Sequence, residues 1–114
     1  MATIYNNIDK VAGDPQSVAV TIALVWDTNT SAVAKDTTNS SFIQGSVTVD
    51  SDELGAWSAD VVDNDSILPT DNAYKITEEI KRSGVKTTYY INVPAGATPN
   101  YWVGDLIIST PSWV

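Results

Sequence analysis

Residues 17–26, SVAVTIALVW, form the stretch that decides the fold of this chain. One parity of the stretch is apolar throughout, with Val18, Val20, Ile22, Leu24 and Trp26. The other parity holds the smaller set Ala19, Thr21, Ala23 and Val25. Successive side chains of a β-strand point to opposite faces, so this alternation predicts a strand. Because both faces are mostly apolar, we expect a long central strand that is covered on both sides.

The same period of two continues along the chain and predicts an all-β protein of about seven strands. We expect the other strands at residues 4–8, 43–49, 57–61, 74–80, 85–93 and 101–108. The acidic turn at residues 50–55 favours a hairpin between the strands on either side of it. At residues 73–80 a short helix is the alternative, but the period of two in the neighbouring segments favours a strand.

The remaining segments predict one domain with a polar loop and a short arm. A chain of 114 residues suits a single sandwich domain, which we place at residues 1–108. Residues 27–41 are rich in Thr, Ser, Asn and Asp, so we expect a long loop there that contacts a partner. Residues 109–114 include Pro111 and Trp113, and we expect a C-terminal arm that docks on a neighbour or frays.

Charge excludes several classes of partner. The chain has 14 acidic and 6 basic residues, and its net charge of −8 disfavours binding to nucleic acid or to an anionic membrane. No apolar run approaches the roughly 20 residues of a membrane-spanning helix. The start of the sequence shows no signal-peptide pattern, so we expect folding in the cytoplasm of the producing cell.

Cysteine and histidine are both absent from the sequence. Their absence removes disulfides, thiolate nucleophiles, Ser-His-acid triads and most transition-metal sites. We therefore predict that the chain is not an enzyme and that it has no catalytic residues, no cofactor and no metal site.

Several short segments, taken in order, resemble a known family. They are residues 13–15, 50–58, 69–79, 89–94 and 105–107. Together they resemble transthyretin-like (carboxypeptidase-regulatory-like, prealbumin-like) Ig-type domains, most closely those of bacteriophage tail-fibre, minor tail and other virion proteins. The resemblance implies an Ig-like, antiparallel β-sandwich of about seven strands and a role in virion architecture or attachment. Residues 28–41 have no counterpart in the family pattern.

Two acidic features are candidate sites. Asp50, Asp52 and Glu53 suggest calcium, but an EF-hand loop needs oxygen ligands where Leu54 and Val61 stand, so a solvated turn is favoured. Residues 63–65 form a second acidic segment, and here too a solvated turn is favoured over a metal site.

Glu78 shares its parity with Tyr74, Ile76 and Ile80, which makes it a candidate buried carboxylate. In related pilin and adhesin domains, a glutamate in a similar strand promotes an isopeptide bond. The resemblance makes Lys10 and Asp105 the candidate partners here. A strand-end glutamate that reaches water is the favoured interpretation.

Aromatic side chains are the candidate contact residues. We expect Trp26 and Trp57 in the core, because they share parity with core positions. Tyr90, Tyr101, Trp102 and Trp113 are the candidates for a partner-contact surface. Such a surface could stack on sugars, but exposed aromatic residues more often anchor protein contacts.

These observations favour a non-enzymatic bacteriophage virion structural protein, either a head decoration or a tail or fibre attachment module. We expect it in the virion after synthesis in the host cytoplasm, in contact with capsid or tail proteins, as a homo-oligomer or in a symmetric assembly. A module that binds host-surface glycans is the alternative, and a bacterial adhesin-type Ig-like domain is less favoured. Hydrolases related to the transthyretin-like fold rely on histidines, which this chain lacks.

Overall fold

The computed structural model describes residues 1–9, 13, 15–96 and 100–114, and its regular structure is nearly all β. The strands are β1 (Ala2–Asn7), β2 (Val18–Trp26), β3 (Ala34–Asp36), β4 (Ser41–Ile43), β5 (Ser46–Asp50), β6 (Ala56–Val61), β7 (Ile67–Leu68), β8 (Asn72–Ile80), β9 (Lys86–Ile91), β10 (Asn100–Trp102) and β11 (Ile107–Ile108). Two short 3₁₀ helices, η1 (Asn64–Ser66) and η2 (Val103–Asp105), interrupt them. The prediction of an all-β, sandwich-like fold is confirmed, although the described strands are shorter and more numerous than expected.

The larger sheet has the order β11-β9-β8-β2-β5, and all its pairs are antiparallel. Strand β2 lies inside it, paired with β8 from Val18 opposite Ile80 to Trp26 opposite Asn72. The predicted central strand is therefore confirmed. Residues 72–80 form a strand and not a helix, as the neighbouring alternation predicted.

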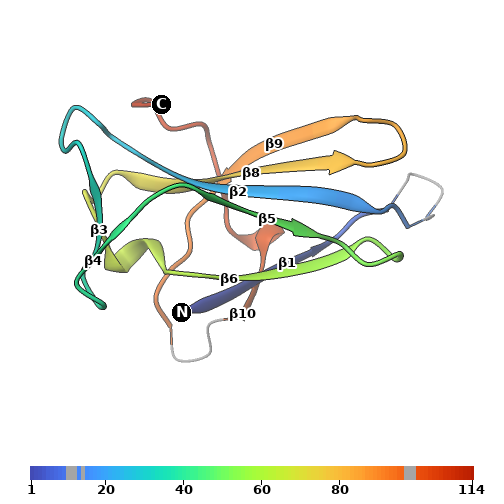
Figure 1. The fold of residues 1–114 in the computed structure, drawn as a ribbon, viewed down its shortest axis with the longest axis horizontal. Coiled ribbons are helices and arrows are strands. Elements are labelled where there is room, and N and C mark those ends of the chain that lie inside the picture. Colours follow the sequence, from blue (N-terminus) through green and yellow to red (C-terminus); the bar gives the residue numbers. More distant parts are fainter. Residues whose placement is uncertain (10–12, 14, 97–99) are drawn as a thin grey trace.

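The smaller main sheet has the order β10-β1-β6 and faces the larger one (Figure 1). Strand β6 runs antiparallel to β1, whereas β10 runs parallel to it, with Thr3 opposite Asn100 and Tyr5 opposite Trp102. The parallel pair departs from the wholly antiparallel sandwich expected from the sequence.

The hydrophobic core fills the space between these two sheets. From β2 it takes Val18 and Val20, both 0% exposed, and from β1 it takes Ile4, also 0% exposed. Trp57 is 4% exposed, so its predicted place in the core is confirmed, and Trp26 packs partly against the same cluster. Burial of these apolar side chains is the main force that holds the sheets together.

The expected hairpin between residues 43–49 and 57–61 is wrong. Strand β5 pairs with β2, whereas β6 pairs with β1 in the opposite sheet. The turn between them is locally tight, because the Asp52 carboxylate accepts from the backbone N–H groups of Leu54 at 2.9 Å and Ala56 at 3.0 Å. The chain nevertheless crosses between the sheets here, since Ser51 N–H donates to Val18 in one sheet and Ile8 N–H donates to Gly55 next to the other.

The single strand expected at residues 101–108 is also wrong. Strand β10 pairs with β1, then η2 turns the chain, and β11 pairs with β9 in the other sheet. The backbone N–H of Leu106 donates to Val103 and closes that turn. Alternation continues through the segment, but Gly104 and Asp105 interrupt the extended backbone.

The polar segment at residues 27–41 is not only a loop. Strands β3, β4 and β7 form a small third sheet with the order β4-β3-β7, which lies at one end of the molecule (Figure 1). Ala34 is 0% exposed and Asp36 is 3% exposed, so part of this segment is buried. The Asp36 carboxylate accepts from Asn39 Nδ2 at 2.7 Å and from the backbone N–H groups of Thr38 and Asn39, which closes the turn between β3 and β4.

Candidate protein-binding surfaces

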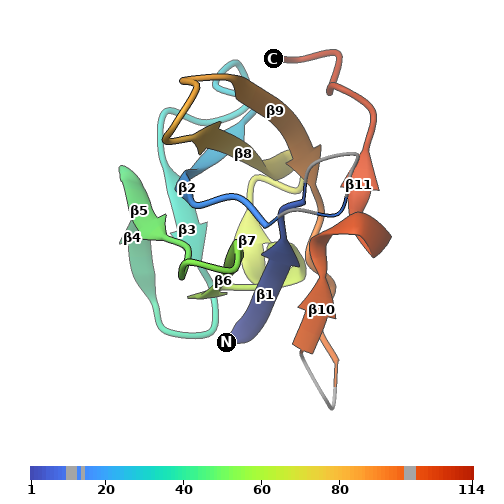
Figure 2. The same cartoon turned by 90° about the vertical axis from the view of Figure 1, so that its right-hand side faces the viewer.

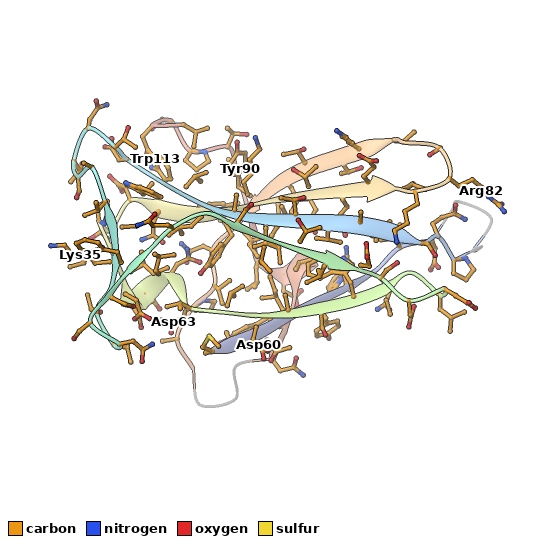
Figure 3. The ribbon with its side chains drawn as sticks, viewed as in Figure 1. Lys35, Asp60, Asp63, Arg82, Tyr90 and Trp113 are labelled. Carbon is orange, nitrogen blue, oxygen red and sulfur yellow. The ribbon has the colours of Figure 1, made fainter. Side chains whose placement is uncertain are left out.

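The four aromatic residues predicted to contact a partner lie on different parts of the fold. Tyr101 and Trp102 belong to β10, whereas Tyr90 belongs to β9 and Trp113 to the C-terminal segment. Figure 3 shows Tyr90 and Trp113 both near the upper side of the larger sheet. Tyr101 packs against the core and its hydroxyl donates to the carbonyl of Pro94 at 3.2 Å, so it is the least available of the four.

Trp102 is the most exposed of the four, at 47%, and it lies beside an aromatic residue that the sequence did not single out. The parallel register places Tyr5, which is 37% exposed, directly opposite Trp102. Trp102 Nε1 donates to Asn6 Oδ1 at 3.0 Å, and this bond fixes the ring orientation. A side chain on Gly104 would collide with the Trp102 ring, with its nearest atoms at 2.5 Å from an added Cβ. The indole is therefore held in one place on the surface.

Glu78 lies in the core between the two main sheets, so it is the buried carboxylate that its parity suggested. Only 5% of it is exposed, so the favoured interpretation, a strand-end glutamate that reaches water, is wrong. Its Oε2 accepts from Trp57 Nε1 at 2.8 Å and from Asn6 Nδ2 at 2.9 Å. Register explains the burial, because Glu78 pairs with the fully buried Val20 in the middle of the larger sheet.

Tyr89 completes this polar cluster. Its hydroxyl is buried and lies beside the side chains of Glu78 and Asn6. Burial, and then the nearby charge of Glu78, raises the pKa of Tyr89 far above its ordinary value. Of the two residues that the predicted isopeptide bond would join, Lys10 lies outside the described residues and Asp105 is exposed. Side-chain donors from β1 and β6 bind the Glu78 carboxylate and so join the two sheets.

The acidic segments act as turns. Asp52 accepts the two backbone bonds described above, and Asp50 lies 3.2 Å from Lys81 Nζ. Asp63 accepts from Ser66 N–H at 3.0 Å at the start of η1, and Asp65 accepts from Ala95 N–H at 2.9 Å. Within residues 1–9, 13, 15–96 and 100–114, no group of three acidic side chains is placed to hold a metal ion.

One side of the sandwich is open, and this feature was not predicted. Among the described strands, β5 ends the larger sheet and β6 ends the smaller one, so each has an edge with no described strand beside it. A cleft of about 230 Å³, which we call the β5–β6 cleft, lies between them. Its lining includes the core residues Ile22, Leu24, Val61 and Tyr74, together with Val47 of β5. Figure 2 shows β5 and β4 at one side of the molecule and β10 and β11 at the other.

The open side is apolar as well as unpaired. Val47 is 47% exposed and Phe42 of the neighbouring strand β4 is 62% exposed. Phe42 lines a second hollow, of about 420 Å³, with Trp26, Val33 and Ile43. An unpaired backbone edge beside exposed apolar side chains is the usual template for adding a strand from another chain.

No protein-family model matches the sequence, and no curated protein matches it. No helix in the described part of the chain is long and apolar enough to cross a membrane.

Proposed function

We propose that this chain is a non-enzymatic structural or attachment module of a bacteriophage particle, and that it acts through protein–protein contacts. The observation that carries the contact role is the open side of the sandwich, where the edges of β5 and β6 flank the apolar β5–β6 cleft. The resemblance of the ordered sequence segments to virion domains supports the placement in a phage particle.

The charge and the fold fit this role. A net charge of −8 keeps the free protein soluble and opposes adhesion to the packaged nucleic acid. The sheet edges give a geometry for strand addition, in which main-chain hydrogen bonds supply affinity and alternate side chains enter the cleft.

Immunogold labelling of purified virus particles from the source tests this proposal. Label over the head is expected for a decoration protein, and label at the tail or its fibres for an attachment module. Antibody absorbed beforehand with the purified chain is the control. Intact particles, with head and tail both present, that carry no label above this control would overturn the placement in a virion.

Glycan binding is a second candidate, and the Tyr5–Trp102 pair favours it. Two exposed aromatic side chains lie side by side on β1 and β10, and the hydrogen bond to Asn6 holds the indole in place. Fixed, exposed aromatic faces are suited to stacking on sugar rings.

A glycan panel read by tryptophan fluorescence separates this candidate from the first. The expected result is saturable, sugar-specific quenching that Trp102→Ala removes and that Phe42→Ala, a change at another exposed aromatic side chain, leaves intact. A flat response of the wild type across the panel contradicts glycan binding and leaves the protein-contact role standing.

A further inference from the structure

We propose that β5 pairs with β5 of a second copy of this chain, antiparallel and about a two-fold axis at Thr48. This inference rests on the proposed contact role and names the partner of one open edge. The two five-stranded sheets would join into one continuous sheet across the dimer.

The β5 edge lacks the devices that usually prevent edge pairing. Exposed edges in natural sheets are commonly blunted by lysine, proline, a bulge or a charge in the strand interior. The sequence of β5 is SVTVD, which has no lysine or proline, and its one charge stands at the end. Its β-branched residues suit a strand with partners on both edges.

The other long edges are better protected. Strand β9 carries Lys86, and β11 already covers it at Tyr90 and Ile91. Strand β6 carries the exposed Asp60 inside the strand. The remaining edge strands β4, β7, β10 and β11 are only two or three residues long, so among the longer described edges β5 is the one most open to self-pairing.

The strand is complementary to itself in one register. An antiparallel pair centred on Thr48 uses all five residues of β5 and places Val47 opposite Val49 of the second copy. Both valines belong to the core-facing parity, because they pair with the buried Ile22 and Val20 of β2. Side-chain alternation is thus kept across the new pair, with apolar residues on one face.

Charge agrees with this register. Asp50 would lie opposite Ser46 of the second copy, so no two like charges are directly opposed. Asp50 is also within 3.2 Å of Lys81 Nζ in its own copy, which offsets part of its charge. The side chains of Val47 and Val49 from the second copy would extend the apolar wall at the mouth of the β5–β6 cleft.

A single engineered cysteine tests both the dimer and its register, because the natural chain has none. Across an antiparallel pair, the two Cα atoms at the axis lie about 4.5–5.5 Å apart, within the range of a disulfide. Thr48→Cys should therefore cross-link to its mate in mild oxidant. Ser46→Cys is the matched control, because its two copies would be about 14 Å apart, four residues along the strand.

We expect Thr48→Cys to form a disulfide dimer at least tenfold faster than Ser46→Cys, measured on non-reducing gels and by intact mass. A third variant, Val85→Cys, places the thiol on the distant turn between β8 and β9 and should be as slow as Ser46→Cys. Equal rates for the three variants would overturn the proposal. Faster cross-linking through Ser46→Cys would overturn the register.

Sedimentation equilibrium supplies a measurement that needs no cysteine. Wild type should dimerise reversibly, and Val47→Lys should shift it to monomer because it buries a charge in the pair. Val85→Lys, a change at another exposed valine (57% exposed), should dimerise like the wild type. A wild type that stays monomeric to about millimolar concentration contradicts the proposal.

Failure of the dimer and failure of the virion placement give different results. Labelled particles with a monomeric chain would keep the proposed function and discard β5 self-pairing. Unlabelled particles with a Thr48-linked dimer would keep the pairing and discard the virion placement.

Discussion

Glu78 shows how one side chain can join two sheets. Its carboxylate accepts from Trp57 in β6 and from Asn6 in β1, although Glu78 itself belongs to β8 in the opposite sheet. Asn6 in turn accepts from Trp102 in β10. A buried charge without these donors would cost several kcal/mol, so the donors are what permits a glutamate in this part of the core.

Removing the Glu78 acceptor should therefore destabilise the protein. Glu78→Ala leaves the buried Trp57 donor and the half-buried Asn6 donor without their acceptor and opens a cavity, so we expect the free energy of unfolding in urea to fall by about 2–4 kcal/mol. Glu78→Gln keeps a carbonyl oxygen and should cost less. Thr87→Ala, a change at the exposed residue opposite Glu78 in β9, is the control and should change stability by less than about 1 kcal/mol. Equal losses for the three variants would contradict this account.

Asp36 should contribute a stability term that depends on pH. The side-chain amide of Asn39, and the backbone N–H groups of Asn39 and Thr38, lower the pKa of Asp36 below 3.8 despite partial desolvation. A carboxyl whose pKa is lowered by folding stabilises the protein above its unfolded pKa, and this term is lost as pH falls through the folded pKa. Asp36→Asn should therefore be less stable than wild type at pH 7, with the gap narrowing below pH 3.8. Urea unfolding of wild type and Asp36→Asn at pH 7 and below pH 3.8 measures this difference in stability. A difference of the same size at both pH values would refute the role of Asp36 ionisation.

At the scale of the elements, the sequence predicted strands better than it predicted their partners. Alternation located β2 and β8 and placed Glu78 on the inner face, because parity depends only on local geometry. It assigned the wrong partners to β5 and β6 and expected a single strand at 101–108, because pairing depends on where each turn sends the chain. The polarity of residues 27–41 hid the small third sheet, in which hydrogen bonds to Asp36 close the β3–β4 turn and Ala34 and Ile67 join the hydrophobic core.

The candidate site was predicted less well than the strands for the same reason. Trp102 was identified by residue type, but its neighbour Tyr5 lies 97 positions earlier and is brought beside it only by the parallel β1–β10 register. The open edges of β5 and β6 follow from strand order, which a single sequence does not reveal. The absence of lysine and proline from residues 46–50 was the one local signal of an unprotected edge.

The turn at Gly55 provides a test of how the chain crosses between sheets. Gly55 has φ of 79°, and a Cβ there would lie 2.5 Å from the Ile8 carbonyl oxygen and 2.7 Å from that of Gln16. Gly55→Ala should lower the free energy of unfolding by more than about 2 kcal/mol, from strain and collision together. Gly84→Ala is the control, because Gly84 has φ of 71° but open space around it. Thermal unfolding compares the two, and equal losses would show that φ alone decides the cost.

At the scale of the whole molecule, the net charge of −8 works against the proposed dimer while its local contacts favour it. Two copies repel each other over roughly the Debye screening length, which is about 30 Å at 10 mM and about 10 Å at 100 mM ionic strength. The β5 pair itself opposes no like charges, so screening should remove repulsion without weakening the contact.

Dimer affinity should accordingly rise with salt. We expect the dimer dissociation constant of the wild type to fall several-fold between 10 mM and 100 mM NaCl, measured by sedimentation equilibrium. Val47→Lys should remain monomeric at both concentrations. A dissociation constant that rises with salt would indicate an interface held by charge pairs and would contradict pairing through β5.

The parallel pairing of β1 with β10 has a consequence for synthesis on the ribosome. Strand β1 emerges well before its partners, because β6 and β10 begin only at Ala56 and Asn100. The nascent chain must therefore carry Ile4 and its neighbours without the complete smaller sheet until β10 has been translated. Pairings this distant in sequence slow folding and leave apolar segments exposed to chaperones. A fusion partner joined directly before β1 would therefore lie beside a sheet that is completed only after β10 has been translated.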